Sequence, residues 1–349
     1  MRRYILMPCL IATVLLFSFP AWAGPTGVLL GLRVDHENGN GNYEPPSYYT
    51  LWIEADNGQI AREKRALEYL LVPRPDGFWT VTSEPVPYPG VYLENYMFHQ
   101  VGGSGMGSAN FLSPWTEGDI RGCELDIKGR ILAVSGDTIT MERSEYYMCQ
   151  GSVHPNYATS LRIAALSQPD AVLEPFGYGL ALDGQAMLRY GRNHPLEQDD
   201  PDFAMCDPDY DDLIQGQTDP LDWSWGMAHI KGRWTLIGRV NFSHGVSACD
   251  RTFLIPMSTP KPLAPLNSGP EWEQVRKTFP QALDFVASPR GDMLLVVEQD
   301  ALYAYPVRES GTGDPVKVVS LSNGAAVVMA EWAYDASVSR WAGAFQTAP

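Results

Sequence analysis

Glycine turns recur along this chain, and each is followed at once by an apolar, strand-like run. They occur at Gly77, Gly129, Gly184, Gly232 and Gly291, with gaps of 52, 55, 48 and 59 residues between these numbers. Glycine supplies the positive backbone angle that a tight turn needs, and the runs that follow are typical of strands. A period of about 50 residues accommodates a four-stranded sheet with its loops. The spacing therefore predicts an all-β chain of small antiparallel sheets.

The clearest copy of the repeated unit is SPRGDMLLVVEQDALYAYPV, residues 288–307. Gly291 lies in its first turn, an apolar run follows from Leu294 to Val297, and Leu302–Tyr303 begins a second run. This pattern resembles the inner strands of a β-propeller blade. The resemblance implies about six or seven small sheets in one β-rich repeat domain over residues 24–349. The alternative is another all-β arrangement in which turn glycines recur by chance.

One short helix is predicted near residues 269–279. Ser268 suits the N-cap, Pro270 suits the first turn, and Glu271 completes a capping box. Three apolar residues then share one face at helical spacing: Trp272, Val275 and Phe279. For the C-terminal segment we predict a hairpin through Tyr334–Asp335, which in a propeller helps to close the ring.

The N-terminal residues 1–23 have the features of a secretory signal peptide. Arg2 and Arg3 precede an apolar run that ends at about Phe19, and Ala21–Ala23 is the small-x-small pattern that signal peptidase accepts. The run is short for a membrane span, although an uncleaved anchor is the alternative. We therefore expect a secreted or periplasmic protein with no membrane span after cleavage.

The chain is strongly acidic, with a formal net charge of −16. Loss of the two signal-peptide arginines takes the charge of the mature chain to −18. Such a surface repels nucleic acid and anionic lipid. We therefore expect a protein or carbohydrate partner, and no nucleic acid.

Four of the five cysteines lie outside the signal peptide: Cys123, Cys149, Cys206 and Cys249. An even number in an exported chain predicts two disulfides. In an antiparallel pair the numbers of opposite residues add to a constant. A hairpin that turns at Gly136–Asp137 sets this constant near 273, and 123 and 149 add to 272. We predict a Cys123–Cys149 bridge, so that the remaining two cysteines, Cys206 and Cys249, pair with each other. The alternative is that the cysteines are free, buried thiols.

The most unusual composition lies between Asn193 and Ile230, with ten acidic residues and no lysine or arginine. At its centre four aspartates stand close together: Asp207, Asp209, Asp211 and Asp212. Alternating carboxylates suit Ca²⁺, a hard cation that takes six to eight oxygen ligands. An EF-hand is excluded, because Asp212 and Thr218 stand where that loop requires glycine and glutamate. The alternative to a Ca²⁺ site is a solvated acidic loop.

Two tryptophans, Trp223 and Trp225, follow the acidic run. In a strand their side chains point the same way, and two indoles on one face form a platform on which a sugar ring stacks. The alternative is that both belong to the core, as tryptophan in a β domain usually does.

No catalytic motif stands out in the sequence. The six histidines have no metal-binding spacing, and the G-x-S-x-G nucleophile elbow is absent. We therefore predict an exported, non-catalytic, propeller-like binding or scaffold protein that recognises a protein or carbohydrate. The alternatives are an exported polysaccharide hydrolase with paired carboxylates from distant segments, and a purely structural envelope component.

Overall fold

The computed structural model is composed largely of β-strands. It describes residues 24–36, 44–63, 65–88, 91–109, 123–149, 156–166, 168–172, 223–244, 247–257, 267–308, 311–321 and 325–349. Within this part of the chain the strands β1–β20 belong to four hydrogen-bonded sheets, and there are two helices. The predicted all-β class is therefore confirmed.

The strands group into five units of consecutive antiparallel strands, which we call blades. Blade 1 contains β20 (Ala326–Tyr334), β1 (Thr26–His36), β2 (Glu44–Asp56) and β3 (Gln59–Arg62). Blade 2 contains β4 (Leu70–Arg74), β5 (Gly77–Tyr88), β6 (Val91–Gln100) and β7 (Met106–Ala109). Blade 3 contains β8 (Cys123–Val134), β9 (Thr138–Cys149), β10 (Asn156–Ala165) and β11 (Gln168–Val172).

The remaining strands form the last two blades. Blade 4 contains β12 (Trp223–Ile230), β13 (Arg233–His244) and β14 (Ser247–Leu254). Blade 5 contains β15 (Asp284–Ala287), β16 (Met293–Val297), β17 (Ala301–Arg308) and β19 (Val316–Ser320), and the short β18 (Gly311–Thr312) also pairs with β17. Blades 2 and 3 share one eight-stranded sheet, because Val91–Leu93 of β6 pair in parallel with Leu125–Ile127 of β8.

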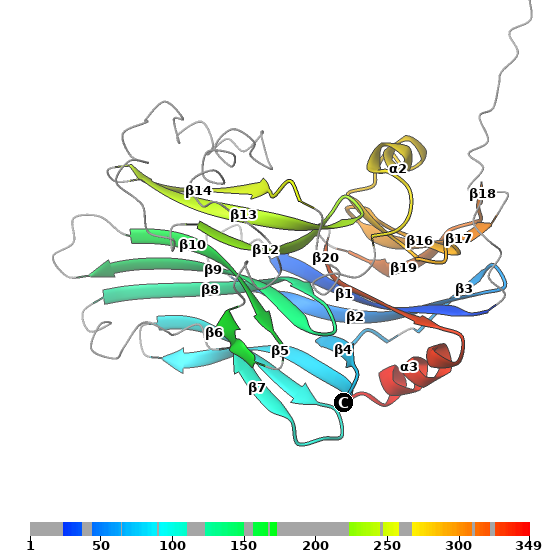
Figure 1. Ribbon diagram of the computed structural model, residues 1–349, viewed down its shortest axis with the longest axis horizontal. Coiled ribbons are helices and arrows are strands. Elements are labelled where there is room, and N and C mark those ends of the chain that lie inside the picture. Colours follow the sequence, from blue (N-terminus) through cyan, green and yellow to red (C-terminus); the bar gives the residue numbers. More distant parts are fainter. Residues whose placement is uncertain are drawn as a thin grey trace, which may run out of the picture.

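The blades are arranged as a propeller. In Figure 1, blades 3 and 4 lie on one side of β20 and blade 5 lies on the other. Strand β20 contacts β8, β12 and β15 of three other blades, which identifies these strands as the innermost ones. The sequence predicted six or seven small sheets, and the part of the chain that the structure describes contains five blades, two of which share one sheet.

Three of the predicted glycine turns connect the first strand of a blade to the second. Gly77 begins β5 directly after the turn from β4, Gly232 lies between β12 and β13, and Gly291 lies between β15 and β16, all at positive φ. Gly129 was predicted wrongly: it lies inside β8, opposite Arg143, where the chain continues straight. The corresponding turn in blade 3 contains Gly136, as the predicted hairpin requires. Gly184 lies outside the described residues.

The two ends of the described chain close the ring. Strand β20 pairs with β1 from Thr26–Tyr334 to Arg33–Ala326, so that blade 1 contains one C-terminal and three N-terminal strands. Blade 5 is tied to the same place: Arg290 donates two hydrogen bonds to Asp335, at 3.0 and 2.6 Å, and stacks on the ring of Tyr334. These contacts join the last blade to the first.

Both helices lie outside the ring of strands. The predicted helix is α2 (Trp272–Thr278), whose N-cap is Glu271 in a capping box with Gln274. Ser268 does not cap it and instead donates to the Ala287 carbonyl. The predicted C-terminal hairpin is wrong: after β20 the chain forms the helix α3 (Ala336–Thr347).

The blades bury both of their faces. In β1 the residues from Thr26 to Val34 are all buried. Val28, Leu30 and Leu32 lie in the hydrophobic cluster shared with blades 4 and 5, whereas Leu29 lies in the cluster shared with blades 2 and 3. This double burial explains why the runs after the turns are continuously apolar rather than alternating. Among the described residues no helix is both long and apolar enough to cross a membrane.

Candidate functional site: an arginine network at the junction of four blades

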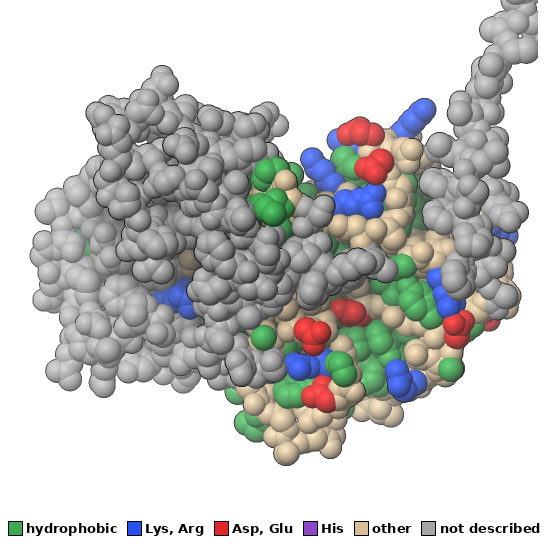
Figure 2. Space-filling model, viewed as in Figure 1, with side chains coloured by type: hydrophobic (Ala, Val, Ile, Leu, Met, Phe, Trp, Pro, Cys, Tyr) green, Lys and Arg blue, Asp and Glu red, His purple; other side chains and the backbone are tan. Residues whose placement is uncertain are grey.

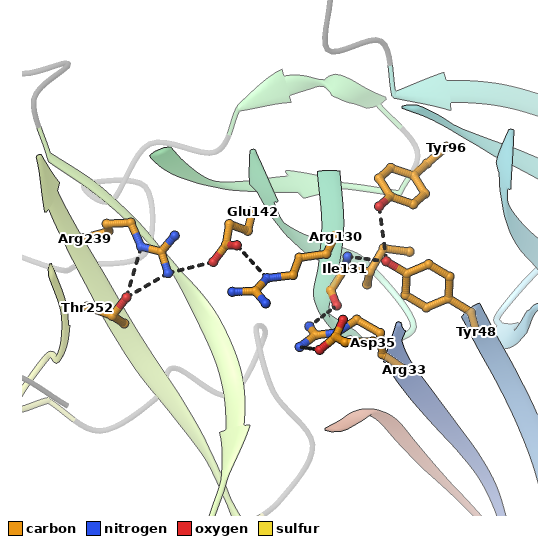
Figure 3. A network of polar contacts seen from close by, with 9 residues as sticks. All are labelled: Arg33, Asp35, Tyr48, Tyr96, Arg130, Ile131, Glu142, Arg239 and Thr252. Carbon is orange, nitrogen blue, oxygen red and sulfur yellow. Dashed lines mark hydrogen bonds and ion pairs between the residues drawn. The ribbon is translucent and has the colours of Figure 1, made fainter. Parts of the chain in front are cut away.

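A network of charged and hydroxyl side chains joins four of the five blades (Figure 3). Strand register explains two of its pairs, because Arg130 lies directly opposite Glu142, and Arg239 directly opposite Thr252. Residues directly opposite in antiparallel strands project from the same face of the sheet. The nine residues drawn are Arg33, Asp35, Tyr48, Tyr96, Arg130, Ile131, Glu142, Arg239 and Thr252.

Glu142 is the buried centre of the network, with 7% of its side chain exposed. Arg130 and Arg239 approach it from opposite sides in Figure 3, with Nε of Arg130 2.5 Å from Oε1 and Nη2 of Arg239 2.6 Å from Oε2. Burial acts to raise the pKa of Glu142, but the two guanidinium groups outweigh it and hold the pKa below its usual range. Glu142 is therefore ionised and links blade 3 to blade 4.

Arg239 is fixed on its other side by blade 4. Its Nε and Nη2 donate to Oγ1 of Thr252 at 3.0 and 2.8 Å, and only 8% of its side chain is exposed. A buried guanidinium is tolerated when its charge is paired and its donors are engaged. Arg239 therefore serves to hold the two blades together.

Blade 1 holds the backbone of β8 beside this ion pair. Arg33 donates through Nη1 to the Ile131 carbonyl at 2.9 Å, and the Ile131 N–H donates to the Tyr48 hydroxyl at 2.7 Å. The β8–β9 register shifts between Ile131 and Ala133, and a bulge leaves backbone groups without their ladder partners. The Arg33 and Tyr48 side chains supply partners to the Ile131 peptide groups at this irregularity.

The remaining contacts complete the blade 1 side. Arg33 also donates from Nε and Nη2 to both carboxylate oxygens of Asp35, at 2.9 and 3.0 Å. The Tyr48 hydroxyl lies 3.1 Å from that of Tyr96, on blade 2. The network thus extends without interruption from blade 1 into blades 2 and 3.

Arg130 differs from the other two arginines because 40% of its side chain is exposed. Its Nε faces Glu142, whereas Nη1 and Nη2 make no hydrogen bond to any residue that the structure describes. Burial acts to lower the pKa of Arg130, but Glu142, Asp35 and Tyr48 together raise it above its ordinary value. Arg130 therefore presents a fixed positive charge whose Nη1 and Nη2 are not used by any described residue.

The structure describes the two tryptophans of the predicted platform to different extents. Trp225 is 5% exposed and belongs to the hydrophobic core with Met227, which favours the core interpretation for this residue. For Trp223 only the backbone is described, at the start of β12. At Trp223 the sugar-stacking platform stays a prediction.

The predicted calcium ligands, Asp207, Asp209, Asp211 and Asp212, all lie outside the described residues. Within the described part of the chain no group of three or more histidine, cysteine, aspartate or glutamate side chains is placed to hold a metal ion. The Ca²⁺ site stays a prediction.

The cysteine hairpin has the predicted register. Cys123 in β8 lies opposite Cys149 in β9, as the sum of their numbers indicated. Cys249 lies in β14, and Cys206 is outside the described residues. The two bridges themselves stay predictions. Peptide mapping without reduction is expected to recover one fragment that joins Cys123 to Cys149, and a Cys123–Cys206 fragment would contradict the assignment.

Glu331 on the innermost strand β20 is a second unusual carboxyl group. Burial raises its pKa to about 7, the negative Asp137 acts in the same direction, and a hydrogen bond from the Gly136 backbone opposes them. The folded protein therefore binds more protons than the unfolded chain between about pH 4.5 and pH 7. Stability that depends on Glu331 falls as the pH rises through this window and does not return above it.

We expect Glu331→Gln to be more stable than the wild type at pH 8, by up to about 3 kcal/mol. The amide cannot ionise, yet its oxygen can still accept the Gly136 hydrogen bond. At pH 4 the two proteins should unfold at nearly the same urea concentration, because the wild-type carboxyl group is then protonated. Urea unfolding at pH 4, 6 and 8 measures the difference. Equal differences at all three values would contradict the assignment, and Glu84→Gln, at an exposed strand position, is the control.

No protein-family model matches the chain, and no curated protein matches it. The sequence had not indicated Arg130, Glu142 or Arg239. For Arg130 and Glu142 the sequence held one signal: each is a charged residue within a strand sequence, GRILAV or TITMER, where a continuous apolar run is expected.

Proposed function

We propose that this protein is an exported, non-catalytic β-propeller that binds a protein or carbohydrate partner. The observation that supports this proposal is the contrast within the arginine network. Arg33 and Arg239 are buried and use their donors to join blades, while Arg130 leaves Nη1 and Nη2 open. A rigid scaffold that fixes a charged donor at a junction of blades is suited to recognition.

The face of the molecule seen in Figure 2 does not by itself indicate another site among the described residues. On the face seen in Figure 2, acidic and basic side chains lie close together over α2 and along the ring below it, with hydrophobic patches between them. A surface of mixed sign gives little long-range preference for a partner. The proposal therefore depends on the fixed network rather than on a charged patch.

A thermal melt of the purified protein tests the binding function. It should be run with a panel of soluble polysaccharides, with Ca²⁺ and with EDTA, because a ligand of the folded state raises the midpoint by mass action. A rise with one glycan supports carbohydrate recognition, and a pull-down from the native envelope tests for a protein partner. If no panel member shifts the midpoint and the pull-down recovers nothing, the proposal is wrong and a purely structural role takes its place.

The hydrolase alternative is supported by one observation, the raised pKa of Glu331. A carboxyl group with a pKa of about 7 suits a general acid, and Asp137 is the negative neighbour that affects it. A glycosidase needs two such carboxyl groups about 5–10 Å apart. Release of reducing sugar from a bound glycan, lost in both Glu331→Gln and Asp137→Asn, would replace the binding proposal with this one.

A further inference from the structure

The open nitrogens of Arg130 define the ligand chemistry of the proposed binding site. Since Nε faces Glu142, the edge that carries Nη1 and Nη2 points away from the ion pair (Figure 3). Two parallel N–H donors on a planar guanidinium match the two oxygens of a carboxylate. The position of this edge is fixed from within the protein by Glu142, whose own side chain is buried.

The net charge of the network determines how much negative charge in a ligand it can neutralise. Three arginines face two carboxylates, Asp35 and Glu142, so the network has an excess of one positive charge. The chain as a whole carries −16. A polyanion would be repelled by the rest of the molecule, whereas one carboxylate neutralises the local excess.

We propose that the Nη1–Nη2 edge of Arg130 binds a single carboxylate group of a small acidic ligand. This inference rests on the proposed binding function and assigns its ligand class. The carboxylate can belong to an acidic sugar or to the C-terminus of a peptide. These sources share the same contact with Arg130 and differ in the rest of the molecule.

Two pairs of probes test the carboxylate and separate its sources. Methyl glucuronide and methyl glucoside differ only in the carboxylate, as do N-acetylglycine and N-acetylglycinamide. We expect calorimetric titration at low salt to detect at least one acid, with a dissociation constant in roughly the millimolar range for so few atoms, and neither neutral partner. Binding of the glucuronide alone identifies a sugar, and binding of N-acetylglycine alone identifies a peptide end.

Two variants test whether Arg130 is the group responsible. Arg130→Lys keeps the charge beside Glu142 but lacks the forked edge, and should weaken acid binding roughly ten- to a hundredfold. Arg340→Gln, at an exposed position on α3, is the matched control and should bind as the wild type does. The unliganded melting temperature of Arg130→Lys must stay close to that of the wild type, which shows that any loss is local.

The inference is overturned if acid and neutral probes bind equally, if no acid binds, or if Arg130→Lys binds an acid as the wild type does. These results leave the binding function intact whenever the glycan panel or the pull-down still identifies a partner whose binding does not depend on Arg130. Failure of the panel and the pull-down together removes the binding function itself.

Discussion

Replacing Glu142 by alanine is expected to lower the free energy of unfolding by about 3–5 kcal/mol. The change leaves the buried Arg239 without the carboxylate that lies 2.6 Å from it. Arg130 loses the same partner but can turn toward water, because 40% of its side chain is already exposed. Most of the cost therefore comes from the buried Arg239, which loses its contact with Glu142. Urea unfolding at pH 7 measures the effect.

Two controls separate the ion pair from a general effect of removing a glutamate. Glu84→Ala, at an exposed position in β5, should change stability by no more than about 0.5 kcal/mol. The double change Glu142→Leu with Arg239→Met replaces both charges and should recover most of the loss, since well-packed apolar pairs often substitute for buried ion pairs. A Glu142→Ala protein within about 1 kcal/mol of the wild type would show that Arg239 does not depend on Glu142.

The same pair also predicts how acid affects the protein. The pKa of Glu142 is lowered in the folded state, so its contribution to stability is complete above the pKa of the unfolded chain and is lost as the pH falls through the folded value. Glu331 has the opposite sign, because its raised pKa removes stability as the pH rises to about 7. Together these two carboxyl groups predict a stability maximum on the acidic side of neutral pH.

The repeated sheets could be predicted from the sequence because the turns between strands are local. A tight turn needs a positive backbone angle, and Gly77, Gly232 and Gly291 supply it within a few residues of the strands they connect. The number of blades could not be predicted in the same way. The sequence IKGR precedes an apolar run at Ile127 and at Ile230, but only the second copy is a turn, because Gly129 is paired inside β8.

The C-terminal error has a different cause. The spacing of Val338, Trp341 and Phe345 is helical, and Val338 and Phe345 are buried in α3. The prediction gave more weight to the apolar strand that precedes them. The predicted strand is present as β20, but the segment that follows it is a helix and does not pair with it. Ring closure was correctly assigned to this segment, although the pairing partner of β20 is β1.

The arginine network could not be predicted because its contacts join residues that are far apart in the chain. Arg33 and the Ile131 carbonyl, like Glu142 and Arg239, lie almost one hundred positions apart, and their contact depends on the order of the blades. Residue type did not indicate that these side chains are buried, since a charged residue in a strand is usually exposed. Only the ring places Arg130 where blades meet.

Replacing Gly232 by alanine is expected to cost about 3 kcal/mol, from backbone strain and from overpacking together. Gly232 forms a two-residue turn with Lys231, and both have positive φ, at 80° and 50°. A Cβ at Gly232 would lie 2.1 Å from the ring of Phe285. Phe285 is fully buried and stacks on Trp272 of α2, so the ring has little room to move.

Gly102 provides the matched control for this change. It also has positive φ, at 70°, but an added Cβ would meet nothing within 4 Å. Gly102→Ala should therefore cost only the backbone strain, about 1 kcal/mol. The excess at Gly232 measures the contact with Phe285, and Gly232→Ala should cost less when Phe285→Leu is already present. If the two glycine substitutions cost the same, the close packing of blade 4 on blade 5 at this turn does not limit stability, and backbone conformation alone explains why glycine occupies the turn.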